Sequence, residues 1–140
     1  MKKSLSLYTV ICSLVFTQVL AQNSTVKNSI TKERIIKVDL PTWRSSGTVI
    51  IGVDADKFKK YVLKKFNLDF QQDLTDAAGF AYTEDTTNWI IWLKELDSAE
   101  LAHEVLHVTS NVLRSRGLTL SNDSEEAFAY TLSDILDQIY

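Results

Sequence analysis

His103 and His107 are the only histidines of this 140-residue chain, and they stand four positions apart in the stretch His-Glu-Val-Leu-His. Residues with this separation lie one above the other when the backbone is an α-helix. Two imidazoles would then point to the same side and could bind a single ion. The spacing therefore predicts a helix with a two-histidine face, and no other feature of the sequence constrains the fold as much.

The residues around this motif predict a helix over residues 97–117. Asp97 or Ser98 can cap its start, and Glu100 stands three residues after Asp97, as in a capping box. Gly117 can adopt the left-handed conformation that ends a helix. Apolar residues recur at helical intervals and give the helix a side to bury; they are Leu101, Val105, Leu106, Val112 and Leu113.

The side chains of the motif have the chemistry of a metal centre. Neutral imidazole nitrogen suits zinc, which in catalytic sites takes three protein ligands and a water. Glu104, next to His103, could accept a proton from a metal-bound water. The opposing interpretation is a metal-free structural domain in which the histidines are core residues, because H-E-x-x-H is short enough to occur by chance.

A final helix is predicted to begin after a cap at residues 122–124 and to run to the last residues of the sequence. Glu125 and Glu126 stand at its start, and either carboxylate could be a third metal ligand. A structural explanation competes with this one. Glu125 stands three residues after Asn122 and Glu126 three after Asp123, so either glutamate could close a capping box.

The chain between residues 32 and 96 predicts a small mixed sheet and one further helix. The helix is capped by Asp54 or Asp56 and ends near Phe66, with its lysines in water. The last two expected strands form a hairpin around a four-residue turn. Together with the two later helices, these elements define an α+β fold; the strands are expected at residues 32–40, 48–53, 78–83 and 88–93.

The first 21 residues have the pattern of a secretory signal peptide. Lys2 and Lys3 precede a mostly apolar run over residues 5–20, and Ala21 stands before the expected cut. The alternative is a membrane anchor, since an uncleaved run of this length could nearly span a bilayer. We therefore expect a secreted or periplasmic protein that does not bind membranes after cleavage. Its expected segments are a signal peptide at 1–21, a flexible lead-in at 22–31 and one domain at 32–140.

Cleavage would leave a chain without cysteine. It removes Cys12 and two lysines, so the formal net charge changes from −3 to −3 − 2 = −5. Any zinc site must then be built from histidine and carboxylate, because no thiolate is left. The negative charge, together with the lack of a basic patch with interleaved aromatic residues, argues against nucleic-acid binding.

The segment from residue 89 to residue 140 resembles the gluzincin metallopeptidases, the thermolysin-like branch of the zincins. The resemblance rests on H-E-x-x-H followed, after a short crossover, by a helix that begins Glu-x-x-Ala. It is similar to small single-domain members in bacteria and phages. This implies a zincin-like fold, Zn²⁺ as cofactor and a peptide or protein substrate. His103, His107 and Glu126 would be the metal ligands, with Glu125 as the alternative third ligand, and Glu104 would be the catalytic base.

The resemblance also implies substrate contacts. In that family an edge strand before the metal helix often binds the substrate backbone, and residues 88–93 match it in place and character. Trp89 and Trp92 would then be either substrate-binding or core residues. Tyr130 stands where the family commonly carries an aspartate that orients a ligand histidine. The candidates for stabilising the transition-state oxyanion are Tyr130, Tyr82, Arg114 and Arg116.

The function expected from this resemblance is zinc-dependent hydrolysis of a peptide bond, with Glu104 as general base for a metal-activated water. The alternative is a zinc-binding module with the zincin fold and no catalytic turnover, acting as a binding or inhibitory protein. The two functions differ in whether stoichiometric zinc is accompanied by peptide cleavage.

Overall fold

The structure, a computed structural model, describes residues 32–84 and 87–140. The expected signal peptide, the lead-in and the middle of the expected hairpin turn lie outside the described residues. Within these ranges the chain is a small α+β domain with one four-stranded mixed sheet and three α-helices. In chain order its elements are β1 (Arg34–Leu40), the 3-10 helix η1 (Pro41–Trp43), β2 (Ser45–Ile51), α2 (Ala55–Phe66), β3 (Gly79–Thr83), β4 (Asn88–Leu93), α3 (Ser98–Ser115) and α4 (Glu125–Ile139).

The strands of the sheet lie in the order β1-β2-β4-β3. β1 is antiparallel to β2, β2 is parallel to β4, and β4 is antiparallel to β3, which confirms the expected hairpin. β4 is therefore an interior strand, and β3 is the free edge beside it. The expectation that residues 88–93 form an edge strand is wrong. Every residue of β4 after Asn88 is buried, because helices cover both faces of the sheet at this strand.

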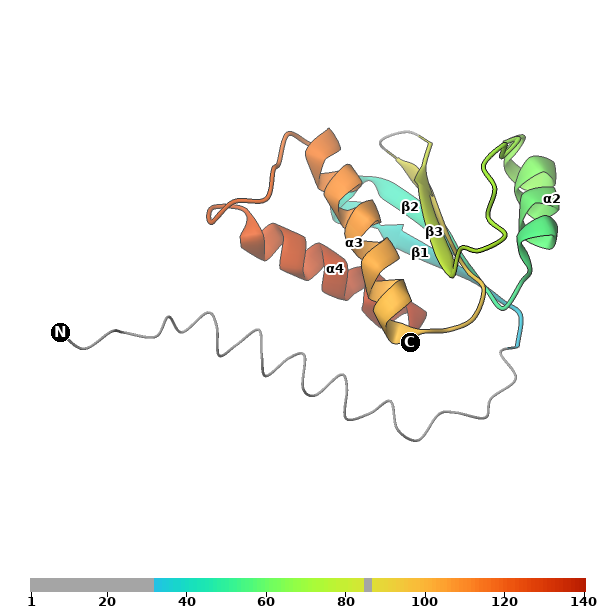
Figure 1. The fold of residues 1–140 in the computed structure, drawn as a ribbon. Coiled ribbons are helices and arrows are strands. Elements are labelled where there is room, and N and C mark those ends of the chain that lie inside the picture. The colour runs from blue at the N-terminus through green and yellow to red at the C-terminus, as the bar shows by residue number, and fades with distance from the viewer. Residues whose placement is uncertain (1–31, 85–86) are drawn as a thin grey trace. The chain divides into compact units, whose positions relative to one another are not determined.

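Helices cover the two faces of the sheet unequally. α3 and α4 lie side by side against one face, and α2 lies against the other (Figure 1). Successive residues of a strand point to opposite faces, so β4 contributes Trp89 to the core under α3 and α4 and Trp92 to the core under α2. Trp89 lies directly over Gly47 of β2, where a side chain would leave no room for the indole ring.

The ends of α3 agree with its sequence signals. The Asp97 side chain accepts hydrogen bonds from the backbone N–H groups of Ala99 and Glu100, both at 2.9 Å. Gly117 has a φ of +79°, as expected for the residue that ends the helix. The capping box is only half formed, because the Glu100 side chain packs over Gly79 of β3. This packing directs the N-terminal half of α3 along the edge strand.

The start of α4 is held by its preceding loop. Ser124 is the N-cap residue, but its hydroxyl donates to the carbonyl oxygen of Thr119 and accepts from the backbone N–H of Ser121. Glu125 and Glu126 are then the first two helical residues, whereas a capping box needs its acidic residue at the third. The capping-box explanation for these two glutamates is therefore wrong.

The described helices give no membrane-spanning segment. Over residues 32–84 and 87–140, none of them has both the length and the apolar character needed to cross a bilayer.

Candidate metal centre

α3 lies along the free edge of the sheet because the residues of β3 that face it have small side chains. β3 reads Gly-Phe-Ala-Tyr-Thr, so its small residues alternate with aromatic ones. Gly79 lies under Glu100, and the Thr83 hydroxyl accepts a hydrogen bond from Asn111 of α3 at 3.3 Å. Contacts at the two ends of the strand thus hold the middle of α3, which carries the histidines, beside the middle of β3.

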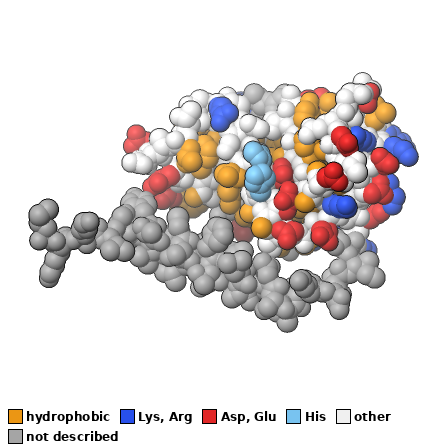
Figure 2. All heavy atoms as spheres, viewed as in Figure 1, with side chains coloured by type: hydrophobic (Ala, Val, Ile, Leu, Met, Phe, Trp, Pro, Cys, Tyr) orange, Lys and Arg blue, Asp and Glu red, His pale blue; other side chains and the backbone are white. Residues whose placement is uncertain are grey.

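The two histidines converge on the exposed side of α3. Their Nε2 atoms lie 3.1 Å apart, at hydrogen-bond distance from each other, and their ring centroids lie 4.7 Å apart. Zn–N bonds are about 2.0–2.1 Å long, so two nitrogens at this separation would subtend roughly 98° at a shared zinc ion, compatible with tetrahedral coordination. The imidazoles reach the surface, with hydrophobic side chains on one side of them and acidic ones on the other (Figure 2). The side chains of His103 and His107 fit two positions of a zinc site.

Glu104 lies between this surface and β3, and it is only 6% exposed. Burial raises the pKa of its carboxyl group, and the nearby Glu100 acts in the same direction. The neighbouring histidines and a hydrogen bond from the backbone N–H of Ala81 favour the charged form and oppose this rise in pKa. A buried carboxylate is therefore held next to the two imidazoles and against the backbone of the edge strand.

The expected third ligand is not part of this cluster. Glu125 and Glu126 are both exposed in the first turn of α4. Over residues 32–84 and 87–140, no three histidine, cysteine or acidic side chains lie together in a group that could hold a metal ion. The donor set beside α3 thus fits zinc through its two histidines, and the carboxylate that would complete it is not in place.

The other residues singled out by the sequence have varied positions. Trp89 and Trp92 are 2% and 0% exposed, so both are core residues in this structure. Tyr130 is 72% exposed on α4. Arg116 donates hydrogen bonds to the carbonyl oxygen of Trp43, which fixes the end of α3 to η1.

The edge of β3 is a feature that the sequence interpretation assigned to the wrong strand. Glu84 donates to the carbonyl of Asn88 and Lys94 to that of Ala78, so the even-numbered residues bond to β4. In an antiparallel pair the alternate residues point their N–H and C=O groups away from the partner. Those of Gly79, Ala81 and Thr83 therefore point outward from the sheet. The alternation of small and aromatic residues in β3 was the signal that could have identified this strand.

No protein-family model matches the chain, and no curated protein or solved structure matches it either.

Proposed function

We propose that the protein is a zinc-dependent peptide-bond hydrolase of the gluzincin kind. The observation that supports this most is the position of three side chains from one helix: two Nε2 atoms 3.1 Å apart, with the buried Glu104 carboxylate beside them. A pair of histidines with an adjacent general base is the arrangement that metal-assisted hydrolysis requires.

In this proposal His103 and His107 hold the zinc ion, and Glu126 of α4 is the third protein ligand, with Glu125 as the alternative. Because neither glutamate groups with the histidines, the first turn of α4 must approach α3 when the metal binds. When bound, zinc polarises the substrate carbonyl group and lowers the pKa of its coordinated water.

Glu104 is the proposed general base. It takes a proton from the attacking water and passes it to the nitrogen of the leaving amine. The backbone N–H of Ala81 beside the carboxyl group favours its charged form, which is the form that can accept a proton.

The substrate is proposed to pair with the outward edge of β3. An extended peptide that adds to an exposed sheet edge gains backbone hydrogen bonds whatever its side chains are. The outward carbonyl group of Ala81 and the outward groups of Thr83 lie on the strand that Glu104 contacts, so a peptide bound there would pass beside the base. The side chain of Tyr82, the oxyanion candidate on this strand, packs against Phe70 on the α2 side of the sheet and so does not face the base.

The alternative function is a zinc-binding module with the same ligands and no catalytic turnover. Elemental analysis of the purified protein and digestion of a mixed peptide library, with and without a chelator, separate the two functions. Hydrolysis requires about one zinc per chain and cleavage that chelator abolishes and zinc restores. One zinc per chain without cleavage would support the binding module, and a protein that takes up no zinc would refute both functions.

A further inference from the structure

A hollow lies on the face of the sheet opposite α3, beyond the end of α2. α2 covers the part of the sheet that contains Ile50 and Trp92, and it stops at Phe66 while the strands continue. The hollow has a volume of about 250 Å³. Pockets for drug-sized molecules commonly have volumes of about 300–1,000 Å³, so this space suits a smaller ligand. We call this space, lined by Lys37, Asp39, Thr48, Phe66, Tyr82 and Ile90 among others, the α2-side hollow.

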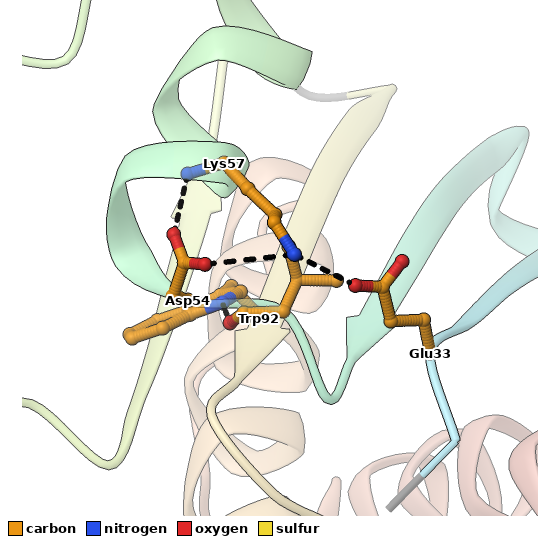
Figure 3. A network of polar contacts seen from close by, with 5 residues as sticks. Glu33, Asp54, Lys57 and Trp92 are labelled. Carbon is orange, nitrogen blue, oxygen red and sulfur yellow. Dashed lines mark hydrogen bonds and ion pairs between the residues drawn. The ribbon is translucent and has the colours of Figure 1, made fainter.

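The start of α2 contacts the rest of the domain through three side chains. Asp54 caps the helix by accepting from the backbone N–H of Lys57 at 2.8 Å, and the Lys57 side chain forms an ion pair with Glu33 at 3.1 Å (Figure 3). The indole N–H of Trp92 donates to the carbonyl oxygen of Val53, just before the helix, at 2.8 Å. These contacts hold the start of α2, and at its other end Phe66 packs edge-on against Tyr61, with ring centroids 6.2 Å apart.

The lining of the hollow is apolar at its centre. Strand register places Tyr82 opposite Ile90, and Ile90 opposite Thr48, all on the α2 side of the sheet. Ile90 is 4% exposed and forms the floor, while Phe66 and Tyr82 are partly exposed aromatic walls. The Tyr82 ring is held edge-on against Phe70, with centroids 5.1 Å apart. Phe66 and Tyr82 therefore offer two aromatic surfaces to an apolar group in the hollow.

Lys37 places a cation at one side of this apolar floor. It lies opposite Thr48 in the register, and its ammonium group donates to the Thr48 hydroxyl at 2.5 Å. The same nitrogen lies 5.7 Å from the centre of the Phe66 ring. An ammonium group has three donors, and the buried Thr48 uses one of them. Lys37 therefore has donors left for an anionic group in the hollow.

Asp39 places an anion beside this cation. It stands two residues after Lys37 on the same strand, so both side chains leave the same face of β1. The backbone of Asp39 is fixed by Gln138, which accepts from its N–H and donates to its carbonyl oxygen, both at 3.0 Å. In the described part of the chain the ion pairs all belong to Lys57, so neither Lys37 nor Asp39 has its charge paired.

We propose that the α2-side hollow binds an aromatic α-amino acid. The carboxylate of the ligand would bind Lys37, its ammonium group Asp39, and its ring would lie over Ile90 between Phe66 and Tyr82. A neighbouring cation and anion beside an apolar floor match a zwitterion with one flat side chain. This site lies on the face of the sheet opposite the histidines and does not depend on the proposed hydrolase activity.

Three ligands of nearly equal shape test this proposal in NMR titrations of the purified protein. L-phenylalanine carries both charges, 3-phenylpropionate lacks the ammonium group, and phenethylamine lacks the carboxylate. L-phenylalanine should bind saturably, and each of the others about tenfold more weakly, as expected for the loss of one charge-assisted hydrogen bond. Equal binding by either analogue, or no saturable binding of L-phenylalanine, would overturn the proposal.

Variants then assign each charge to its residue. Lys37→Gln should weaken the binding of L-phenylalanine about tenfold and leave the binding of phenethylamine unchanged. Asp39→Asn should weaken the binding of L-phenylalanine and leave the binding of 3-phenylpropionate unchanged. Lys64→Gln on the exposed side of α2 is the matched control. His103→Ala should bind L-phenylalanine as the parent does. If the control variant or His103→Ala weakened binding as much as Lys37→Gln, the ligand would lie elsewhere and the assignment would be wrong.

Discussion

The buried carboxyl group of Glu104 on α3 lies against the backbone N–H of Ala81 on β3, and this neighbour favours the charged form of the carboxyl group. The contact joins the proposed base to the one edge of the sheet that lies beside the histidines. An extended peptide paired with β3 would therefore lie against the same helix face that presents the imidazoles. The relationship makes the edge strand part of the proposed active site, and it can be tested separately from the metal.

Thr83→Pro should reduce peptide cleavage without unfolding the protein. The N–H of Thr83 points outward, so proline there removes a donor for a paired peptide and no bond of the sheet. One lost backbone hydrogen bond corresponds to about a five- to tenfold decrease in kcat/KM. Steady-state kinetics with a cleaved peptide measure this decrease in kcat/KM, and the zinc content of the variant should equal that of the parent.

Two neighbouring variants serve as controls for that experiment. Thr83→Val keeps the N–H but loses the hydrogen bond from Asn111, so it measures the effect of that side-chain contact alone, and Thr83→Pro should reduce cleavage further. Tyr82→Pro removes a bond between β3 and β4 and should lower the free energy of unfolding by about 3 kcal/mol or more. Equal cleavage by Thr83→Pro and the parent would show that the substrate does not pair with this edge.

Gly47→Ala should destabilise the protein although glycine at this position has no special backbone conformation. An added Cβ would lie 2.1 Å from Cδ2 of Trp89, so the buried indole must move. Overpacking of this kind costs about 1–3 kcal/mol, measurable by urea denaturation. The exposed neighbour Ser46→Ala should stay within about 0.5 kcal/mol of the parent. If the two variants unfolded at the same urea concentration, the packing of Trp89 on Gly47 would be wrong.

Zinc should raise the melting temperature of the protein, and His103→Ala or His107→Ala should abolish that rise. A ligand at 100 times its Kd stabilises the folded state by about 2.7 kcal/mol. Both histidines are exposed, so the metal-free variants should melt close to the metal-free parent. Calorimetry with added zinc or chelator provides the comparison. An identical melting temperature in zinc and in chelator would indicate a metal-free structural domain.

Glu126→Ala should weaken zinc binding by at least tenfold, whereas Glu125→Ala should change it little. Loss of groups that only support metal ligands already costs about 10–100-fold in affinity, so loss of a ligand should cost no less. Competition with a chromophoric chelator gives both values. The opposite result would assign the third position to Glu125, and unchanged affinity in both variants would exclude α4 from the site.

The helices and the hairpin could be predicted from local signals. Asp97 and Gly117 determine the ends of α3 through bonds and dihedral angles that involve only nearby residues. The same is true of Asp54, whose side chain caps α2. The second strand begins at Ser45 rather than at residue 48, because parallel pairing with β4 and antiparallel pairing with β1 extend it beyond its apolar run.

The position of each strand in the sheet could not be predicted in the same way. β4 follows β3 in the chain, but it lies between β3 and β2, a long-range parallel pairing that no local pattern encodes. The apolar residues of β4 reflect burial on both faces, which is typical of an interior strand. The position of Glu126 relative to the histidines depends in the same way on how α4 packs against α3. The number of residues between Glu126 and the histidines does not determine this packing.

The substitution Glu104→Gln tests the central claim most directly, because the amide keeps the shape of the side chain and cannot accept the proton from water. Zinc content and kcat/KM on a cleaved peptide are measured together, with Glu100→Gln, one turn away on α3, as the control. The proposal predicts parental zinc content and at least a 100-fold lower kcat/KM for Glu104→Gln, in the usual range for loss of a general base. Cleavage by Glu104→Gln at the rate of the parent, with zinc bound, would contradict it.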